Sequence, residues 1–363
     1  MFDRLLVYLI LSGAALLTAL PANSQNYQAN LTATGNYIAG QQLSDGAILY
    51  TSSQIDPYFA NLAAIGWLKD NETSRIPAVE AWMTWYIKHF NWPDYAGIYG
   101  TVYNYNYSNG VETSIGAYDS ADAYAATFLS LAEALWNTGN SGAQSFLQSI
   151  GWYDFNVVGN VVTNLQQSNG LVWAKKDYQI EYTMDNSEDY RGLSDVASLA
   201  LQAFDDSSSQ AWYNAHASSI QTGMQTYLKV SGSNLYQTSL GAGAPNMAGY
   251  WYPDAVAQLY PIIDGIIAAN SAQATSIYLQ FNNAWPGWPS LSFNQSTSTK
   301  HGDPFPWCVV SYASYLEKDD ARTNQYIDSI QTKYVNVNPP FPWYFHPGEG
   351  GWFMRTNSAM LSQ

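Results

Sequence analysis

Acidic residues stand just ahead of nearly all-apolar helical segments at six places along this chain. They share one setting, the start of an expected helix, and are Asp56, Asp119 with Asp122, Asp185 with Glu188 and Asp189, Asp254, Asp303, and Glu349. Two carboxyl groups can cleave a glycosidic bond if one is protonated and assists the leaving oxygen while the other acts as base or nucleophile. The recurrence indicates that helix starts from distant parts of the chain bring such groups together.

Two segments hold the strongest candidates for the proton donor. Asp119 and Asp122 are three residues apart at a helix start, so both can lie on one face. Asp119 is equally suited to capping that helix, whereas Asp122 lies one turn in, in an apolar setting. In DNSEDYRGL, crowding by like charge would raise the pKa of Glu188, although an ion pair of these acids with Arg191 is the alternative. We expect Glu188 or Asp122 to be the donor.

The second carboxyl group, the ionised one that acts as base, is expected in or next to a loop. Asp45 in QQLSDGAILY is either a simple Asp-Gly turn or an acid on a loop that reaches the site. We expect Asp119 or Asp45 to act as the base. The acids of DNSEDYRGL could also bind calcium, but no complete calcium-loop spacing is present, and the histidines are too scattered for zinc. No metal and no cofactor is predicted.

The composition favours a carbohydrate of low charge as the partner. Net charge is −15, yet only 11% of the residues are charged, and no basic patch exists that would attract nucleic acid. Aromatic residues reach 15%, and many stand in expected loops, where flat rings can stack on sugars, although large cores bury Trp too. The expected substrate-binding residues share this loop setting and are Asp254, Trp251, Tyr252, Trp173, Trp307, His301 and Asp303.

Residues 1–24 have the pattern of a secretory signal peptide. Arg4 precedes an apolar run, and PANSQ follows with small residues before an expected cut after Ser24. The run is short for a bilayer span, so a membrane anchor is the weaker alternative. We expect a secreted monomer, extracellular or periplasmic, with no membrane contact after cleavage. Cys308 is the one cysteine, so no disulfide can form within the chain.

The helical pattern predicts an all-α fold, with one domain over residues 41–363 after a polar lead-in at 25–40. Segments that are apolar almost all round, expected to be inner helices, lie near 57–69, 121–137, 189–204, 254–269, 305–317 and 351–362. Striped segments, expected outside them, lie near 76–90, 209–229, 270–284 and 319–333, and the outer helices of the second and last repeats are weakly defined. Such repeats predict a closed (α/α)6 toroid.

Two insertions are expected on the rim that carries the acids. The segments 97–118 and 155–183 each contain an Asn-Gly pair, at 109–110 and 169–170. Asn-Gly between alternating residues is a strong signal for a tight β-hairpin turn. Short hairpins are therefore predicted ahead of two inner helices.

At the level of this repeat, residues 40–362 resemble the six-hairpin glycoside hydrolases, which are (α/α)6 toroids that act on polysaccharides. The local features that carry the resemblance are QQLSDGAI, YDSADAYAATFL, MDNSEDYRGL, YWYPDAV and GDPFPW. The resemblance implies a groove or pocket at one end of the barrel, with two carboxylates facing each other across it.

The expected function is that of a secreted glycoside hydrolase that cleaves a neutral or weakly charged polysaccharide, with inversion expected by analogy. A polysaccharide lyase on the same fold is one alternative, although it needs cations to neutralise a uronate and the chain has only 13 Lys and Arg. A noncatalytic glycan-binding protein is the other, because it would use the aromatic residues without the acids.

Overall fold

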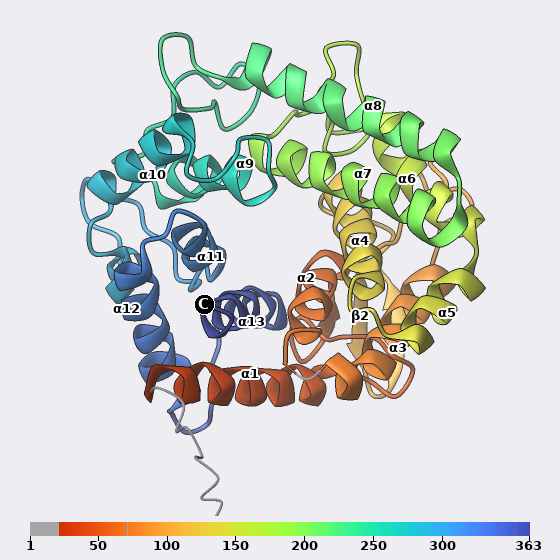
Figure 1. Ribbon diagram of the computed structural model, residues 1–363, viewed down its shortest axis with the longest axis horizontal. Coiled ribbons are helices and arrows are strands. Elements are labelled where there is room, and N and C mark those ends of the chain that lie inside the picture. The colour runs from red at the N-terminus through yellow and green to blue at the C-terminus, as the bar shows by residue number, and fades with distance from the viewer. Residues whose placement is uncertain (1–21, 71) are drawn as a thin grey trace, which may run out of the picture.

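The computed structural model describes residues 22–70 and 72–363, which form a ring of helices in two concentric layers (Figure 1). The signal peptide expected at 1–24 lies, up to residue 21, outside the described residues. The inner layer consists, in chain order, of α2 (Pro57–Trp67), α4 (Ala121–Trp136), α7 (Thr183–Phe204), the run from η2 (Trp251–Ala255) through η3 (Val256–Leu259) to α9 (Tyr260–Ile263), α11 (Val309–Leu316) and α13 (Pro347–Leu361). The prediction of an (α/α)6 toroid is confirmed.

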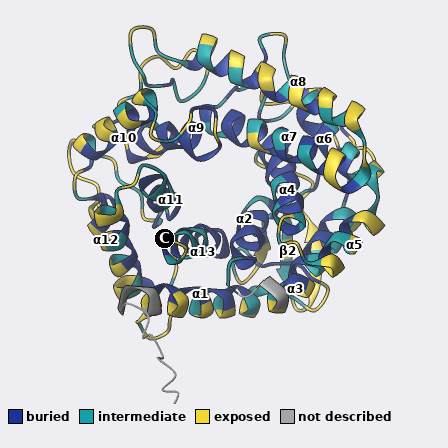
Figure 2. Ribbon diagram, in the orientation of Figure 1, coloured by how far each residue is buried: buried dark blue, intermediate teal, exposed yellow. Residues whose placement is uncertain are grey.

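The outer layer covers this inner ring. It contains α1 (Ala22–Gln41), α3 (Glu72–Lys88), α5 (Ser141–Ile150), α6 (Trp152–Leu165), α8 (Ser207–Gly223), α10 (Ala272–Ala284) and α12 (Asp320–Ile330). Short turns extend some of these helices or link them: η1 (Met224–Leu228), η4 (Trp288–Ser290), η5 (Ser292–Asn294) and η6 (Gln331–Val335). Figure 2 shows the consequence for burial, since the inner helices are dark blue on most sides while the outer ones expose one face. In the part of the chain that the structure describes, no helix is long and apolar enough to cross a membrane.

The start of α2 illustrates how the sequence sets an inner helix. Asp56 is its N-cap, and the carboxylate accepts hydrogen bonds from the backbone N–H groups of Tyr58 (3.1 Å) and Phe59 (3.4 Å). Pro57 occupies the first turn, where the missing backbone N–H of proline costs no helical hydrogen bond. Almost every residue of the helix is buried, which agrees with its apolar sequence. The cap therefore places an acid at the mouth of the ring.

The segment 25–40, predicted to be a polar lead-in, is instead most of helix α1. The helix has no strong apolar stripe, but Leu31 and Ile38 are fully buried and it packs along α13. Asn30 donates a side-chain hydrogen bond to Asn357 at 2.8 Å. The outer helix that the last repeat lacks in sequence thus comes from the other end of the chain. Tertiary packing, and not local pattern, makes this segment helical.

One of the two expected hairpins is present as a sheet. Strands β2 (Tyr105–Ser108) and β3 (Val111–Ser114) pair antiparallel, with β1 (Gln54–Ile55) on the other edge of β2. Asn109 and Gly110 form the turn, with φ angles of 51° and 78°. The prediction for 155–183 was wrong in its first part, because α6 continues to Leu165; the remainder holds an isolated bridge between Gln166 and Val172.

The ring closes where the first inner helix meets the last. A Cβ atom added at Gly66 of α2 would lie 2.2 Å from the carbonyl oxygen of Gly351, and one added at Gly351 would lie 2.1 Å from that of Leu62. The two backbones therefore touch, and only glycine fits at either position. This contact joins segments almost 300 residues apart, and it holds the acids of α2 and α13 at the same mouth.

Replacing either glycine tests this closure. Gly66→Ala or Gly351→Ala forces the two backbones apart, and we expect each to lower the free energy of unfolding by about 2 kcal/mol. Chemical denaturation measures this change. Gly40→Ala is the matched control, because a Cβ there meets nothing within 4 Å, and it should stabilise the helix by about 0.5–1 kcal/mol. Equal effects in all three variants would contradict the closure argument.

Candidate active site

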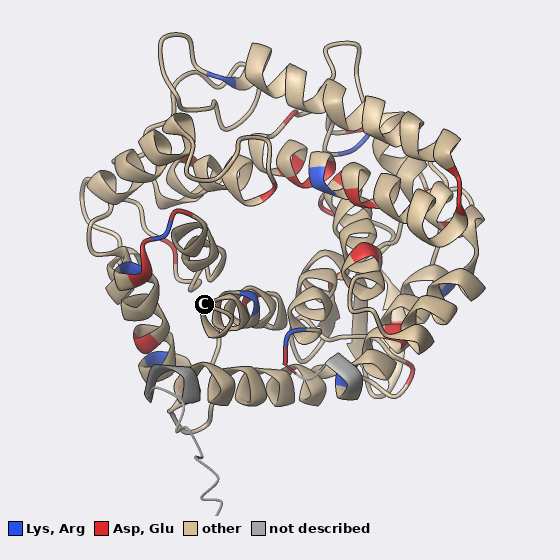
Figure 3. Ribbon diagram, viewed as in Figure 1, with Lys and Arg blue, Asp and Glu red and all other residues tan. Residues whose placement is uncertain are grey.

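A cavity of 690 Å³ lies where the N-terminal ends of the inner helices meet. Its acidic lining residues come from four of these helices or the loops before them, and are Asp56, Asp119, Asp177, Asp185, Glu188 and Glu349. Charged residues are otherwise sparse on the ring (Figure 3). Four of the six helix starts predicted to supply acids therefore bring an acid to one cavity. The other two border it through Tyr252 and Trp307, but their acids, Asp254 and Asp303, do not line it.

Glu188 is held at the side of the cavity, on α7. Its Oε1 accepts a hydrogen bond of 2.6 Å from the Tyr58 hydroxyl of α2. Burial raises the pKa of Glu188 well above its ordinary value, and the negative charges of Asp264 and Asp185 raise it further. The hydrogen bond from Tyr58 acts in the opposite direction but does not cancel these effects. The raised pKa favours the protonated form of this carboxyl, which suits a proton donor.

Glu349 lies in the first turn of α13. One oxygen accepts the backbone N–H of Trp307 at 3.1 Å and the other that of Cys308 at 2.6 Å. Burial raises the pKa of Glu349 to about 7, although these two N–H groups favour the ionised form. Trp307 has a φ of 53°, a left-handed conformation that is unusual for a large side chain and that accompanies its contact with Glu349. The carboxylate is thus fixed in one orientation.

Two further acids of the cavity are tied into hydrogen bonds. Besides capping α2, Asp56 accepts from Asn104 and from the Tyr124 hydroxyl, each at 3.3 Å. Burial raises its pKa to about 6. Asp185 accepts from the Ser120 hydroxyl at 3.0 Å, and burial raises its pKa to about 6 as well.

The rest of the lining is aromatic and carries little positive charge. Tyr252 and Trp307 stack with ring centroids 4.7 Å apart at one side of the cavity. Lys175 is the single Lys or Arg among the described lining residues. Burial lowers the pKa of His346 to about 3, so this histidine is neutral. The site can therefore stack on sugar rings but offers little to an anionic ligand. Within the described ranges, no group of His, Cys, Asp and Glu is suited to hold a metal ion.

Of the residues predicted from sequence, Asp119, Glu188, Tyr252 and Trp307 line this cavity. Asp122 does not: it is fully buried, with one oxygen bound by Ser120 and by the backbone N–H of Ala123 (2.7 Å). Burial raises the pKa of both Asp122 and its neighbour Asp189 well above the ordinary value. Asp122 thus lies in the packing of α4 against α7, and its catalytic role stays a prediction.

The other predicted residues also lie outside the lining. Asp45 is exposed and accepts the N–H of Ala47 (3.2 Å), as expected for the simple Asp-Gly turn that was the alternative prediction. Trp251 is a core residue stacked on Phe293, with centroids 3.7 Å apart. Asp254 ties its own loop by accepting the N–H of Asn246. The remaining three, Trp173, His301 and Asp303, do not border the cavity either.

Sequence reasoning did not select several residues that the structure places here. Tyr58 and Glu349 were absent from the predicted site, although Glu349 belonged to the series of helix-start acids. The membership of Glu349 in that series was the sequence signal that could have identified it. Tyr58 carries no such signal, because its role depends on the approach of α2 to α7 across the ring mouth.

Comparisons with known proteins agree with this architecture. No family model and no curated protein matches the chain. A solved structure described as a glycosidase is similar with a TM-score of 0.65 and 11% identity, over 94% of this chain and 100% of that one. A glutamate-to-alanine variant of a glycosidase, similar with the same TM-score, was solved in complex with glucose.

Two other solved structures cover nearly as much. A novel α-amylase from Clostridium perfringens matches with a TM-score of 0.59 and 7% identity, over 92% of this chain and 98% of its own. A GH76 α-mannanase from Bacteroides thetaiotaomicron matches with a TM-score of 0.53 and 10% identity, over 92% and 95%. At such identities the likeness shows the fold alone, an (α/α)6 toroid that these carbohydrate-active proteins share.

The buried acids of the site predict how stability depends on pH. Asp56, Asp185 and Glu349 have pKa values raised to about 6, 6 and 7. A raised carboxyl pKa stabilises the fold below the unfolded value of about 4, and that contribution is lost as the pH rises through the folded value. We expect the free energy of unfolding to fall between about pH 4 and pH 7.

Denaturation at pH 5 and pH 8 checks this expectation. Glu349→Gln should lose less stability than the wild type between these two pH values, because the amide does not ionise. Asp206→Asn is the control, since the hydrogen bond from Ser209 lowers the pKa of Asp206 and its contribution is present at both pH values. A wild-type protein that is more stable at pH 8 than at pH 5 would refute the argument.

Proposed function

We propose that this protein is a secreted glycoside hydrolase that cleaves a neutral or weakly charged glycan. One observation carries the proposal: two buried glutamates, Glu188 and Glu349, enter the same cavity from helices on opposite sides of the ring. In Figure 1, α7 and α13 face each other across the central opening, separated by α2 and α4 on one side. Carboxyl groups that approach from two sides can act on opposite faces of one sugar ring.

The two glutamates differ in the way that hydrolysis requires. Its buried and negatively charged surroundings raise the pKa of Glu188 and favour its protonated form, and it gives its proton to the glycosidic oxygen. Glu349 is oriented by two backbone N–H groups that favour its ionised form, and it accepts a proton from the attacking water. The water adds across the broken bond, so no net proton is consumed. With Glu349 acting as base toward water, the proposed reaction proceeds with inversion at the anomeric carbon.

The charge of the lining supports the substrate class. The six acids and one lysine of the lining would repel a polyuronate. A neutral sugar, in contrast, can donate hydrogen bonds from its hydroxyl groups to these acids and can stack on the rings of Tyr252 and Trp307. The lyase alternative is disfavoured for the same reason. The apolar run after Arg4 supports secretion.

Amide variants test the chemistry. Glu188→Gln and Glu349→Gln should each lower kcat by at least about 10³-fold, measured as release of reducing ends from a panel of neutral glycans. Asp254→Asn is the matched control and should keep near-full activity, because its carboxylate holds a loop outside the cavity. Asp119→Asn tests the other predicted base. If it abolished turnover while Glu349→Gln did not, the assignment of the base to Glu349 would be wrong.

The same panel separates the alternatives. New ultraviolet absorbance from an unsaturated product would indicate a lyase, and binding without any new reducing end would indicate a noncatalytic protein. The anomer formed first, followed by NMR, would show inversion or retention.

The stacked aromatic pair should act on binding more than on the chemical step. Removing the indole in Trp307→Ala takes away the partner of Tyr252 and a face for the sugar. We expect KM to rise about tenfold while kcat changes little, since ring stacking is worth about 1 kcal/mol or more. Trp251→Phe is a contrasting core variant that should lower thermal stability and leave KM unchanged. A large loss of kcat alone in Trp307→Ala would argue against a binding platform.

A further inference from the structure

A second cavity, of 270 Å³, lies behind Glu188 at the other end of the inner helices. Lys69, which follows α2, and Asn137 and Thr138, which follow α4, mark its outer part. The substrate cavity, by contrast, begins at the N-terminal ends of the same two helices. The two cavities therefore open towards opposite faces of the toroid.

Glu188 belongs to both cavities. Together with Leu62 and Trp352 it lines each of them, so these three side chains form the partition. Its Oε1 is bound by Tyr58, but its buried Oε2 has no hydrogen-bond partner among the described residues. Buried polar atoms are normally satisfied by protein or by water. Oε2 of Glu188 is therefore expected to have a hydrogen-bond partner, such as a water molecule.

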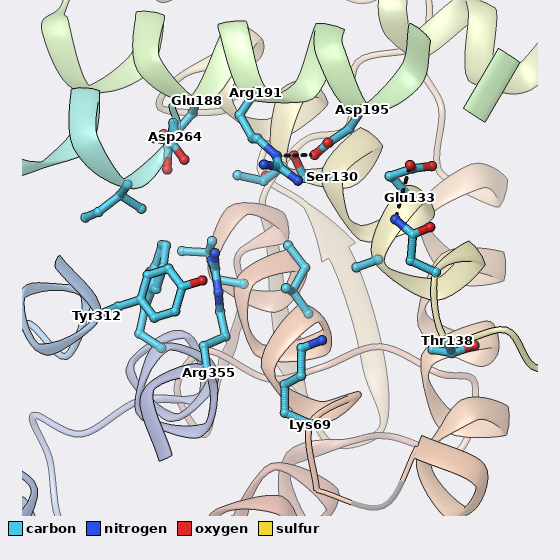
Figure 4. Close-up of a pocket in the computed structure, with 17 residues that line it drawn as sticks. Lys69, Ser130, Glu133, Thr138, Glu188, Arg191, Asp195, Asp264, Tyr312 and Arg355 are labelled. Carbon is cyan, nitrogen blue, oxygen red and sulfur yellow. Dashed lines mark hydrogen bonds and ion pairs between the residues drawn. The ribbon is translucent and has the colours of Figure 1, made fainter. Parts of the chain in front are cut away.

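Asp264, at the end of α9, lines the second cavity close to Glu188 (Figure 4). Its Oδ2 is also buried without a hydrogen-bond partner in the described part of the chain. A cavity of this size holds water readily, and a water needs two or more polar partners. Two unsatisfied carboxyl oxygens beside the same space meet that requirement.

We propose that this second cavity is a water-filled route along which Asp264 passes protons between Glu188 and the solvent at the face opposite the substrate. The inference rests on the proposed function of Glu188 as proton donor. While sugar fills the front cavity, Glu188 has given its proton to the leaving oxygen and is ionised. Asp264 then transfers a proton to Glu188 through the bridging water and is itself reprotonated from water in the route. Glu349 releases the balancing proton on the other side.

Several charged groups surround Asp264 and set its behaviour. Burial raises the pKa of Asp264 to about 7, while Arg355 of α13 and Arg191 of α7 act to lower it and Asp195 to raise it. Arg355 is held in place over the ring of Trp352, 3.8 Å from its centroid, and Arg191 is paired with Asp195 at 2.8 Å. The other titratable groups facing the cavity are Glu188, Glu133, Lys69 and Tyr312. A carboxyl that titrates near neutral pH exchanges protons in both directions.

The test compares Asp264→Asn with Glu133→Gln. Both remove a carboxylate from this cavity, but Glu133 lies at its outer part, bound by Ser198 and Asn137. In Asp264→Asn we expect kcat at pH 8 to fall at least about tenfold with KM unchanged, and the basic limb of kcat/KM to move to lower pH, because the charge that keeps Glu188 protonated is gone. Glu133→Gln should keep the wild-type profile. Identical profiles in the three proteins would overturn the proposal.

A cavity-filling variant addresses the route itself. Ala134→Phe places a ring in the cavity lining, and it should reduce kcat and leave KM unchanged, while Ala134→Ser should not. Thermal unfolding confirms that each variant is folded. Wild-type kcat in a folded Ala134→Phe variant would show that protons do not travel this way.

An infrared measurement separates failure of this proposal from failure of the proposed function. The carbonyl band of the protonated Glu188 is identified by its loss in Glu188→Gln, and its titration needs no substrate. Its midpoint should move to lower pH in Asp264→Asn and stay in place in Glu133→Gln. An unmoved midpoint in Asp264→Asn would overturn the coupling even if hydrolysis is found, whereas a moved midpoint would support it even if no substrate is found.

Discussion

The ring of helices is closed by the contact between Gly66 and Gly351, through which the first inner helix meets the last. Backbone against backbone leaves no room for a side chain at either position. Helix α1 then lies along α13 and completes the outer layer. Without this closure the N-terminal ends of α2 and α13 would not share a mouth. The cavity and its acids depend on it.

The cavity in turn imposes an electrostatic cost on the fold. Inner helices are buried on both sides, so an acid in the first turns of such a helix is desolvated. Helix N-termini and hydrogen bonds recover part of this cost: Asp56 caps α2, and Glu349 accepts two backbone N–H groups. Glu188 recovers less, with one hydrogen bond from Tyr58. The difference in compensation is what gives otherwise similar glutamates opposite roles in the proposed mechanism.

A toroid has two ends, and in this structure Glu188 lines the cavity at each of them, the substrate cavity and the rear cavity. A donor that must be reprotonated in each cycle benefits from a path that the substrate does not block. Asp264 lies on that path with two arginines near it, so its charge responds near neutral pH. The geometry of the ring thereby separates the entry of sugar from the entry of protons.

The sequence by itself determined the repeat of apolar and striped helices, and with it the toroid, because burial on two sides leaves a mark on composition. It also determined that acids precede the inner helices, and it placed Asp119, Glu188, Tyr252 and Trp307 at the site. The tertiary structure decided the rest. The role of α1 follows from its packing on α13, which could not be predicted because its apolar stripe is weak. Asp122 and Trp251 turned into the packed interior, and Glu349 and Tyr58 turned into the cavity. Which side of a helix start faces the ring mouth depends on how each helix is rotated against its neighbours, and contacts between distant segments set that rotation.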